Sequence, residues 1–245
     1  FPERRFVNGF SLDSTMVIVD WVSKDTTTTI DFYNQFGGGV LMGFDNFSPA
    51  TTGGTGQNGV GGSMARFTLL NQYLYTVSNS NLRVFDVVDP VKPVVKSNIN
   101  MGWNIETIYP VKDKLFIGSQ TGMFVYSISN PMAPSQLCTF THASSCDPVI
   151  ADDQFAYITL RSGTTCQGFS NQLDIVDISN ISNPTWQKTY PLTNPHGLSK
   201  DANLLFICDG SAGLKVFDAT DIHNLQLIKS IPMRSTFDVI TLNKR

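Results

Sequence analysis

The sequence predicts an all-β protein, a β-propeller built from four-stranded antiparallel blades. The first observation is a repeat: Leu115 follows Leu74, and Leu214 follows Leu173, by the same interval of 41 residues. The second is that apolar and polar residues alternate within each repeat, which is typical of β-strands. The third is that Asn, Asp, Gly and Pro separate the alternating runs, as in turns. A period of about 40 residues with four short strands is typical of a propeller blade.

The second repeat shows how the strands of a blade follow from its residues. We expect strands at Glu106–Val111, Leu115–Ser119, Met123–Ile128 and Gln136–Phe140. The four strands of any blade are called a, b, c and d in chain order. Pro131 closes the turn after strand c, because proline cannot donate to a sheet ladder. One such sheet cannot cover both of its faces, so each blade needs neighbours.

The repeats divide the chain into blades within a single expected domain, residues 1–245. Complete repeats are expected at residues 63–104, 105–146, 147–195 and 196–236. Residues 1–62 are expected to form a divergent blade, in which residues 5–25 supply strands a and b before a long glycine-rich loop. Residues 237–245 are expected to begin a further blade. The chain would then be a partial ring, or part of a propeller of about six to eight blades.

Composition bounds the function. Apolar residues make up 41% of the chain, enough for a substantial core, and charged residues only 15%. The formal net charge is -3 and no basic tract occurs, so we expect no nucleic-acid partner. No run of about 18 apolar residues is present, so we expect no membrane-spanning helix in this chain. We also expect a longer precursor, whose upstream part could carry a signal or a lipid anchor.

Strand c carries a family resemblance. It reads LRVFD at Leu82–Asp86, LDIVD at Leu173–Asp177 and LKVFD at Leu214–Asp218, and the second repeat departs slightly with MFVYS. With the turns that follow, these segments resemble the LVIVD-repeat family of β-propellers over about residues 65–245. The resemblance implies a bacterial envelope or secreted protein. It implies no catalytic residues, because the family has no established common activity.

Four cysteines are present, and none has the spacing of a zinc site. Cys146 precedes strand a of the third repeat, and Cys166 lies after its strand b. Antiparallel pairing brings these points to one edge of the sheet, so we expect a Cys146–Cys166 disulfide, with two free loop thiols as the alternative. The disulfide would favour an oxidising compartment. Cys208 and Cys138 lie in expected strands, where cysteine acts as a small apolar side chain.

One face of the predicted ring is more elaborate than the other. The d–a and b–c connections emerge on one face, and the a–b and c–d turns emerge on the other. Both long insertions, residues 25–63 and 162–171, are expected b–c loops, so we expect binding on their face. Three aromatic residues near it, Trp103, Phe169 and Trp21, are candidate contacts for a protein or a sugar. The alternative is that they hold the long loops against the ring.

Four ionisable residues are predicted at one mouth of the central channel. Glu106, Asp147 and His196 each lie nine residues before strand b, and Asp238 lies near the same position of the last, partial repeat. Together they could attract a cation or hold a polar ligand. The alternative is that they cap backbone N–H groups or face water. We expect no other cofactor, and we assign no residue as a metal ligand.

Sequence motifs of catalysis are absent. The three histidines lie in different repeats, and no GxSxG, HExxH or P-loop motif occurs. Asp152 and Asp153 resemble a pair of catalytic carboxylates, but they lie in an expected a–b turn exposed to solvent.

We therefore expect a non-catalytic, extracytoplasmic protein-interaction scaffold. It would be a cell-surface or outer-membrane-associated subunit of a Gram-negative-type bacterium, lipid-anchored through an upstream segment and docked to other envelope proteins. The alternative function is binding, hydrolysis or lysis of a carbohydrate or other small polar ligand at the channel mouth. A propeller fold supports both functions and does not choose between them.

Overall fold

The structure is a computed structural model that describes residues 61–102, 104–141, 148–162 and 171–241. By its internal contacts the chain divides into two compact units, Phe1–Thr51 and Thr52–Arg245, and all described residues belong to the second. The single domain expected for residues 1–245 therefore stays a prediction. The divergent blade expected at residues 1–62 lies almost wholly outside the described residues.

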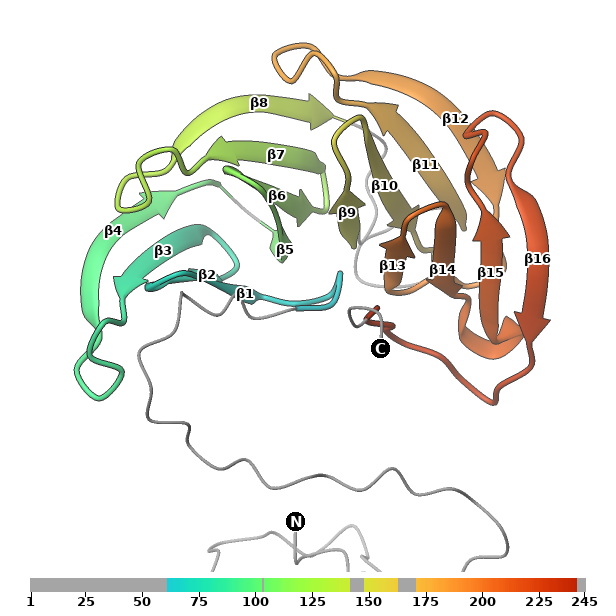
Figure 1. The fold of residues 1–245 in the computed structure, drawn as a ribbon, viewed down its shortest axis with the longest axis horizontal. Coiled ribbons are helices and arrows are strands. Elements are labelled where there is room, and N and C mark those ends of the chain that lie inside the picture. The colour runs from blue at the N-terminus through green and yellow to red at the C-terminus, as the bar shows by residue number, and fades with distance from the viewer. Residues whose placement is uncertain (1–60, 103, 142–147, 163–170, 242–245) are drawn as a thin grey trace, which may run out of the picture. The chain divides into compact units, whose positions relative to one another are not determined.

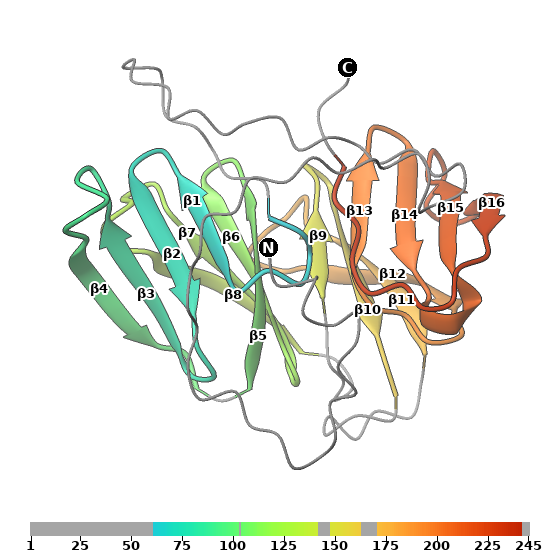
Figure 2. The same cartoon turned by 90° about the horizontal axis from the view of Figure 1, so that it is seen from below.

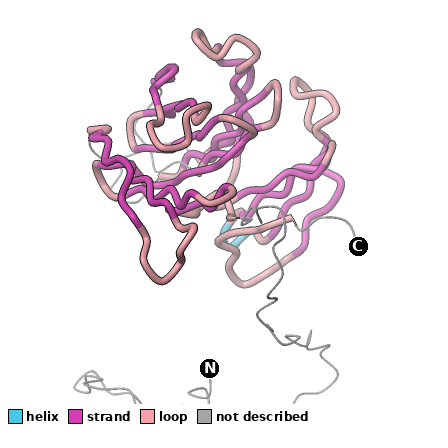
Figure 3. Tube along the Cα trace, turned by 60° about the vertical axis from the view of Figure 1, so that its left-hand side comes forward, coloured by secondary structure: helices cyan, strands magenta, loops and turns pink. Residues whose placement is uncertain are grey.

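Within the described residues the chain forms four antiparallel four-stranded sheets, and strands make up most of the trace in Figure 3. Blade 1 contains β1 (Phe67–Leu70), β2 (Tyr73–Val77), β3 (Asn81–Asp86) and β4 (Val94–Asn100). Blade 2 contains β5 (Ile105–Val111), β6 (Lys114–Ser119), β7 (Gly122–Ser127) and β8 (Ser135–Thr141). Blade 3 contains β9 (Val149–Ala151), β10 (Phe155–Leu160), β11 (Gln172–Asp177) and β12 (Thr185–Pro191). Blade 4 contains β13 (Leu198–Asp201), β14 (Leu204–Cys208), the short 3-10 helix η3 (Gly210–Ala212), β15 (Leu214–Asp218) and β16 (Gln226–Ile231).

The four sheets are successive propeller blades. Figure 1 shows strands β1, β5, β9 and β13 on the inside of the arrangement and β4, β8, β12 and β16 on the outside, and Figure 2 shows the same sheets from the side. In each sheet the strands pair in chain order. Every strand boundary predicted for the second repeat lies within one residue of the observed one. The predicted all-β fold of four-stranded antiparallel blades is confirmed.

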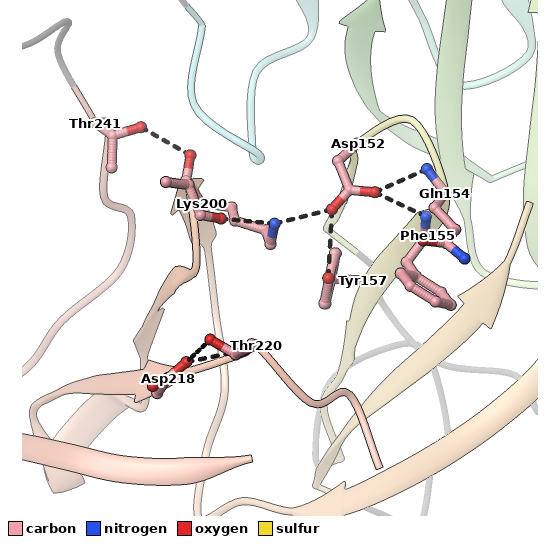
Figure 4. Close-up of polar contacts among 9 residues, drawn as sticks. Asp152, Gln154, Phe155, Tyr157, Lys200, Asp218, Thr220 and Thr241 are labelled. Atoms are coloured by element: carbon pink, nitrogen blue, oxygen red, sulfur yellow. Dashed lines mark hydrogen bonds and ion pairs between the residues drawn. The ribbon is translucent and has the colours of Figure 1, made fainter. Parts of the chain in front are cut away.

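The residue that ends strand c also begins the c–d turn, in all four blades. Asp86, Ser127, Asp177 and Asp218 each accept a hydrogen bond from the backbone N–H two residues later, at 2.8–3.2 Å. Three residues further on, Asp89, Asn130, Asn180 and Asp221 do the same at 2.9–3.3 Å. Figure 4 shows this contact for Asp218 and Thr220. The repeated aspartate of strand c is therefore a turn-forming residue, because a short polar side chain can bond its own backbone two residues on.

The outermost strand of every blade contains a β-bulge. The pairing of strands c and d shifts by one residue at equivalent places, which leaves one strand d residue unpaired in each blade: Lys96, Leu137, Gln187 and Ile228. A bulge increases the local twist of an edge strand and interrupts its row of free hydrogen-bonding groups. The repeated bulge therefore protects the outer edge of each blade from pairing with another sheet.

The hydrophobic core lies between neighbouring blades. Each blade junction has its own cluster, because strand b turns alternate side chains toward the preceding and the following blade. In β6, for example, Ile117 packs with blade 1 and Phe116 packs with blade 3. The inner strands show that an apolar side chain here is buried only when a neighbouring blade covers it. Ile108, Val149 and Leu198 are at most 1% exposed, whereas Phe67 at the same position of blade 1 is 62% exposed. Among the described residues, no sheet covers that face of blade 1.

Candidate functional site

Several of the predicted site residues lie outside the described residues. These are Trp21, Trp103, Cys146, Asp147, Cys166 and Phe169. The Cys146–Cys166 disulfide and the three aromatic contacts therefore stay predictions. The other two cysteines are described: both are free, Cys208 is buried in β14, and Cys138 is partly buried in β8.

The predicted channel-mouth residues that the structure describes are Glu106, His196 and Asp238. Glu106 lies at the start of β5, where its Oε1 accepts a hydrogen bond from Gln120 Nε2 at 3.0 Å within blade 2. His196 and Asp238 lie close to each other beside β13, since the His196 ring contacts Phe237 and the neighbouring Gly197 contacts Asp238. Of these three residues, the structure thus brings His196 and Asp238 close together, and each of the three contacts its own neighbours.

His196 is a buried histidine engaged in packing. Its side chain is enclosed, with the residue only 5% exposed, and its ring meets that of Phe237 edge to face with 4.9 Å between centroids. Burial lowers the pKa of His196, and the charge of Arg161 lowers it further against the opposing effect of Asp209. The imidazole is therefore neutral at pH 7. This state suits a packed ring better than it suits an electrostatic site.

Asp238 joins three segments that are distant in the sequence. Its Oδ1 accepts hydrogen bonds from Ser63 Oγ at 3.2 Å and from the Val239 N–H at 3.0 Å. Gly62 and Gly197 make this approach possible, because a Cβ atom at either position would collide with the Asp238 carboxylate. Ser63 Oγ also accepts a hydrogen bond from the Leu198 N–H at 2.8 Å. Partial desolvation raises the pKa of Asp238 despite these hydrogen bonds.

The segment around Asp238 differs from the prediction. A strand was expected to begin at residue 237, but residues 232–241 are in no strand. They lie beside β13 instead: the Gly197 N–H donates to Phe237 O at 2.7 Å, and the hydroxyls of Ser199 and Thr241 are hydrogen-bonded at 2.9 Å. Thr241 Oγ1 also donates to Lys200 O at 3.3 Å, as Figure 4 shows. No described strand pairs with this segment, so it lacks the ladder that defines a strand.

Asp152 is less exposed to solvent than the sequence suggested. In the a–b turn of blade 3 its carboxylate accepts the backbone N–H groups of Gln154 and Phe155, and it pairs with Lys200 Nζ of blade 4 at 2.9 Å (Figure 4). Partial burial raises the pKa of Asp152, but the hydrogen bonds from Phe155 and Gln154 and the Lys200 charge outweigh burial and leave the pKa below its usual value. This aspartate links two blades.

A groove opens between blades 1 and 2 among the short a–b and c–d turns. Its volume is about 340 Å³. The walls and rim of this blade 1–2 groove are formed by Leu70, Asn71, Tyr73, Tyr75, Lys112, Asp113, Ile128, Ser129 and Pro131. The sequence predicted binding on the face of the b–c connections and did not indicate this groove. The signal was present in the c–d turns, where Pro131 takes the place of Ile181 and Ile222 in blades 3 and 4.

Two features were sought and not found in the described part. Within residues 61–102, 104–141, 148–162 and 171–241, no three His, Cys, Asp or Glu side chains are grouped so that they could hold a metal ion. In the same ranges, no helix has the length and apolar character needed to cross a membrane.

Comparison with known proteins identifies the repeat and the fold. The LVIVD repeat family matches residues 165–191, which contain β11 and β12. No curated protein matches the chain in sequence.

The solved structures that are similar to this chain include the following three. One is a functionally unknown protein from Desulfotomaculum acetoxidans, with TM-score 0.54 and 14% identity over 75% of this chain and 57% of that one. The second is the computationally designed Ika8 protein, with TM-score 0.53 and 11% identity over 73% and 52%. The third is the periplasmic gluconolactonase PpgL of Pseudomonas aeruginosa, with TM-score 0.50 and 16% identity over 66% and 54%.

At these identities the similarity shows the fold alone. The chain spans just over half the length of each of these structures. The four blades share one order of strand pairing, and the LVIVD repeat match includes strand c of blade 3. Both observations agree with the structural similarity. The chain is a β-propeller that contains an LVIVD repeat.

Proposed function

We propose that this chain is a non-catalytic protein-interaction scaffold, located outside the cytoplasm, that docks to other proteins of a cell envelope. A difference between blades at equivalent positions of the c–d turn supports the proposal. Val88 and Val91 in blade 1 are 67% and 84% exposed, and Met132 in blade 2 is 43% exposed. Blades 3 and 4 carry polar residues at these positions: Ser179, Ser182, Thr220 and His223.

These exposed apolar side chains do not contribute to forming the turn. The turn is shaped by side-chain oxygens bonding the backbone, and blades 3 and 4 make the same turn with polar residues at its tip. Val94 and Val95, which follow directly in β4, are 54% and 58% exposed, so four exposed valines lie within residues 88–95. A local concentration of exposed apolar side chains is typical of surfaces that contact another protein.

The alternative function, ligand chemistry at the channel mouth, has less support. Of its predicted residues, Glu106 bonds Gln120 within its own blade and His196 packs against Phe237. Asp238 is bonded by Ser63 and the Val239 N–H. Each of these contacts stabilises the local structure around its own residue.

The test is a substitution that copies the repeat's own polar residues. In the triple variant Val88→Ser, Val91→Ser, Met132→Ser, the turn should form as in blades 3 and 4 while the apolar surface is lost. The tagged protein and the variant are cross-linked to an envelope fraction of the source organism, and co-purified proteins are quantified by mass spectrometry. We expect recovery of the specific partner to fall by about tenfold or more, which corresponds to about 1.4 kcal/mol.

A matched control carries Ser179→Thr and Ser182→Thr at the equivalent turn of blade 3, and should retain the partner. Unchanged recovery with the triple variant would contradict the proposal. So would a protein that is recovered as a monomer without any cross-linked partner.

A further inference from the structure

We infer that the blade 1–2 groove binds an extended, uncharged peptide segment of a partner protein, which inserts a branched aliphatic side chain between the two blades. The inference rests on the proposed function, because it names a ligand that a docking propeller would hold. It concerns the groove and not the exposed valines of blade 1.

The other two blade junctions show what fits this position. In each junction the c–d turn of the later blade leans on the earlier blade and places one residue against its strands a and b. Ile181 of blade 3 packs against the core cluster between blades 2 and 3, and Ile222 of blade 4 is 8% exposed in the cluster between blades 3 and 4. In blade 2 the equivalent residue is Pro131, and there the groove is open. The position that is filled by isoleucine in blades 3 and 4 is thus filled by the smaller proline ring in blade 2.

The groove is held in its open form by the surrounding structure. Tyr75 is 1% exposed, and its hydroxyl donates to Pro131 O at 3.0 Å, so the c–d turn of blade 2 cannot collapse onto blade 1 without losing this bond. Burial raises the pKa of Tyr75 to about 12, and the hydroxyl remains a donor across the physiological range. A preformed pocket reduces the entropy that is lost on binding.

The walls and the rim select the class of ligand. Leu70, Tyr73, Ile128 and Pro131 supply apolar surface of the kind that buries an aliphatic side chain. At the rim, Lys112 pairs with Asp153 at 2.6 Å and Asp113 pairs with Lys114 at 2.6 Å. The charges around the groove therefore cancel, which complements an uncharged segment and disfavours a nucleic acid or an anionic metabolite.

The test uses two short peptides and the isoleucine methyl signals of the protein. The probes are acetyl-Ala-Ala-Ile-Ala-Ala-amide and the same peptide with alanine in place of isoleucine. Each is titrated to about millimolar concentration, and NMR follows the methyl group of Ile128 in the groove wall. We expect saturable shifts of Ile128 with the isoleucine peptide, and binding about tenfold weaker with the alanine peptide, because the aliphatic side chain supplies the buried area.

Two variants test the location. Pro131→Ile should fill the groove as isoleucine does in blades 3 and 4, and Ser129→Arg should block it from the rim without touching the core; each should abolish the response. Ser179→Arg makes the same change at the equivalent turn of blade 3 and should leave the response intact.

The groove proposal is overturned if Ile128 does not respond, if both peptides bind equally, or if the response survives Ser129→Arg. These outcomes are independent of the turn variants. If the partner is still recovered with the triple variant Val88→Ser, Val91→Ser, Met132→Ser, the proposed function is contradicted. If the peptide response is absent, only the groove proposal is contradicted.

Discussion

At the scale of single residues, two buried threonines differ in one hydrogen bond. Thr159 Oγ1 donates to His196 O at 2.6 Å, whereas the buried Thr68 Oγ1 has no hydrogen-bond partner among the described residues. A buried polar atom without a partner costs free energy, and one with a partner does not. Thr68→Val should therefore increase the free energy of unfolding by about 1 kcal/mol.

The matched substitution Thr159→Val should lower the free energy of unfolding by about 1–2 kcal/mol, since it leaves a buried carbonyl without its donor. Urea denaturation followed by tryptophan fluorescence measures both. A loss of stability in Thr68→Val comparable to that of Thr159→Val would show that Thr68 has a partner in solution.

Two equivalent glycines are required by backbone geometry. Gly122 is the first residue of strand c in blade 2 and has a φ of 152°, and Gly213 directly precedes strand c in blade 4 and has a φ of 84°. A Cβ atom at these positions would collide with the carbonyl oxygens of Phe140 and Ile231 in strand d. Gly122→Ala and Gly213→Ala should each lower the free energy of unfolding by at least about 2 kcal/mol, because strain and collision add.

Gly102 provides the control for this prediction. It also has a positive φ, of 102°, but nothing lies within 4 Å of an added Cβ. Gly102→Ala should cost only the backbone strain, about 1–2 kcal/mol. If thermal denaturation gave the same loss of stability for all three variants, the collision with strand d would have no role.

At the scale of single elements, the sequence predicted the features that depend on the type of a residue. The ends of strand c and the turns after it follow from Asp86, Asp177 and Asp218, whose side chains bond the backbone. The bulge in strand d could not be predicted. Lys96, Leu137, Gln187 and Ile228 share no chemical property, so the bulge comes from the way strands c and d pair and not from the residue that is unpaired.

The contact between the a–b turn of blade 3 and β13 of blade 4 predicts a dependence of stability on pH. Because the pKa of Asp152 in the folded protein lies below its unfolded value, this residue stabilises the fold at neutral pH. The contribution is complete above the unfolded pKa of about 4 and is lost as the pH falls through the folded value. Asp152→Asn should lower the free energy of unfolding at pH 7 by about 1–2 kcal/mol, and this difference should shrink toward pH 3.

The neighbouring Asp153→Asn is the control. Its ion pair with Lys112 has both side chains 69% exposed, so little stability should be lost at any pH. Urea denaturation at a series of pH values measures both variants. A difference between Asp152→Asn and the parent protein that stays constant down to pH 3 would contradict the assignment.

At the scale of the whole molecule, the fold was predictable and the candidate site was only partly so. The period, the alternation and the turn residues determine four blades, because each repeat encodes its own sheet. The channel mouth depends on contacts between distant segments, such as Ser63 with Asp238, that no repeat encodes. At the blade 1–2 groove Pro131 stands in place of the isoleucine of blades 3 and 4, a difference that is visible only when the turns are compared across blades.

The location of the whole molecule can be tested through its cysteines. The protein contains four, of which Cys138 and Cys208 are free thiols in strands. If Cys146 and Cys166 form a disulfide, the protein isolated from its native compartment and denatured without reductant should be alkylated only at Cys138 and Cys208, and at all four after reduction. Peptide mapping by mass spectrometry assigns the sites.

The disulfide should also stabilise the folded protein. A bond that closes a loop of about 20 residues is worth about 3 kcal/mol in the chain-entropy model, so Cys146→Ser should lower the free energy of unfolding by about that amount. The same change made under reducing conditions should cost little, because the loop is then already open. Alkylation of Cys146 and Cys166 without reductant would remove the disulfide and, with it, the main chemical argument for an oxidising, extracytoplasmic environment.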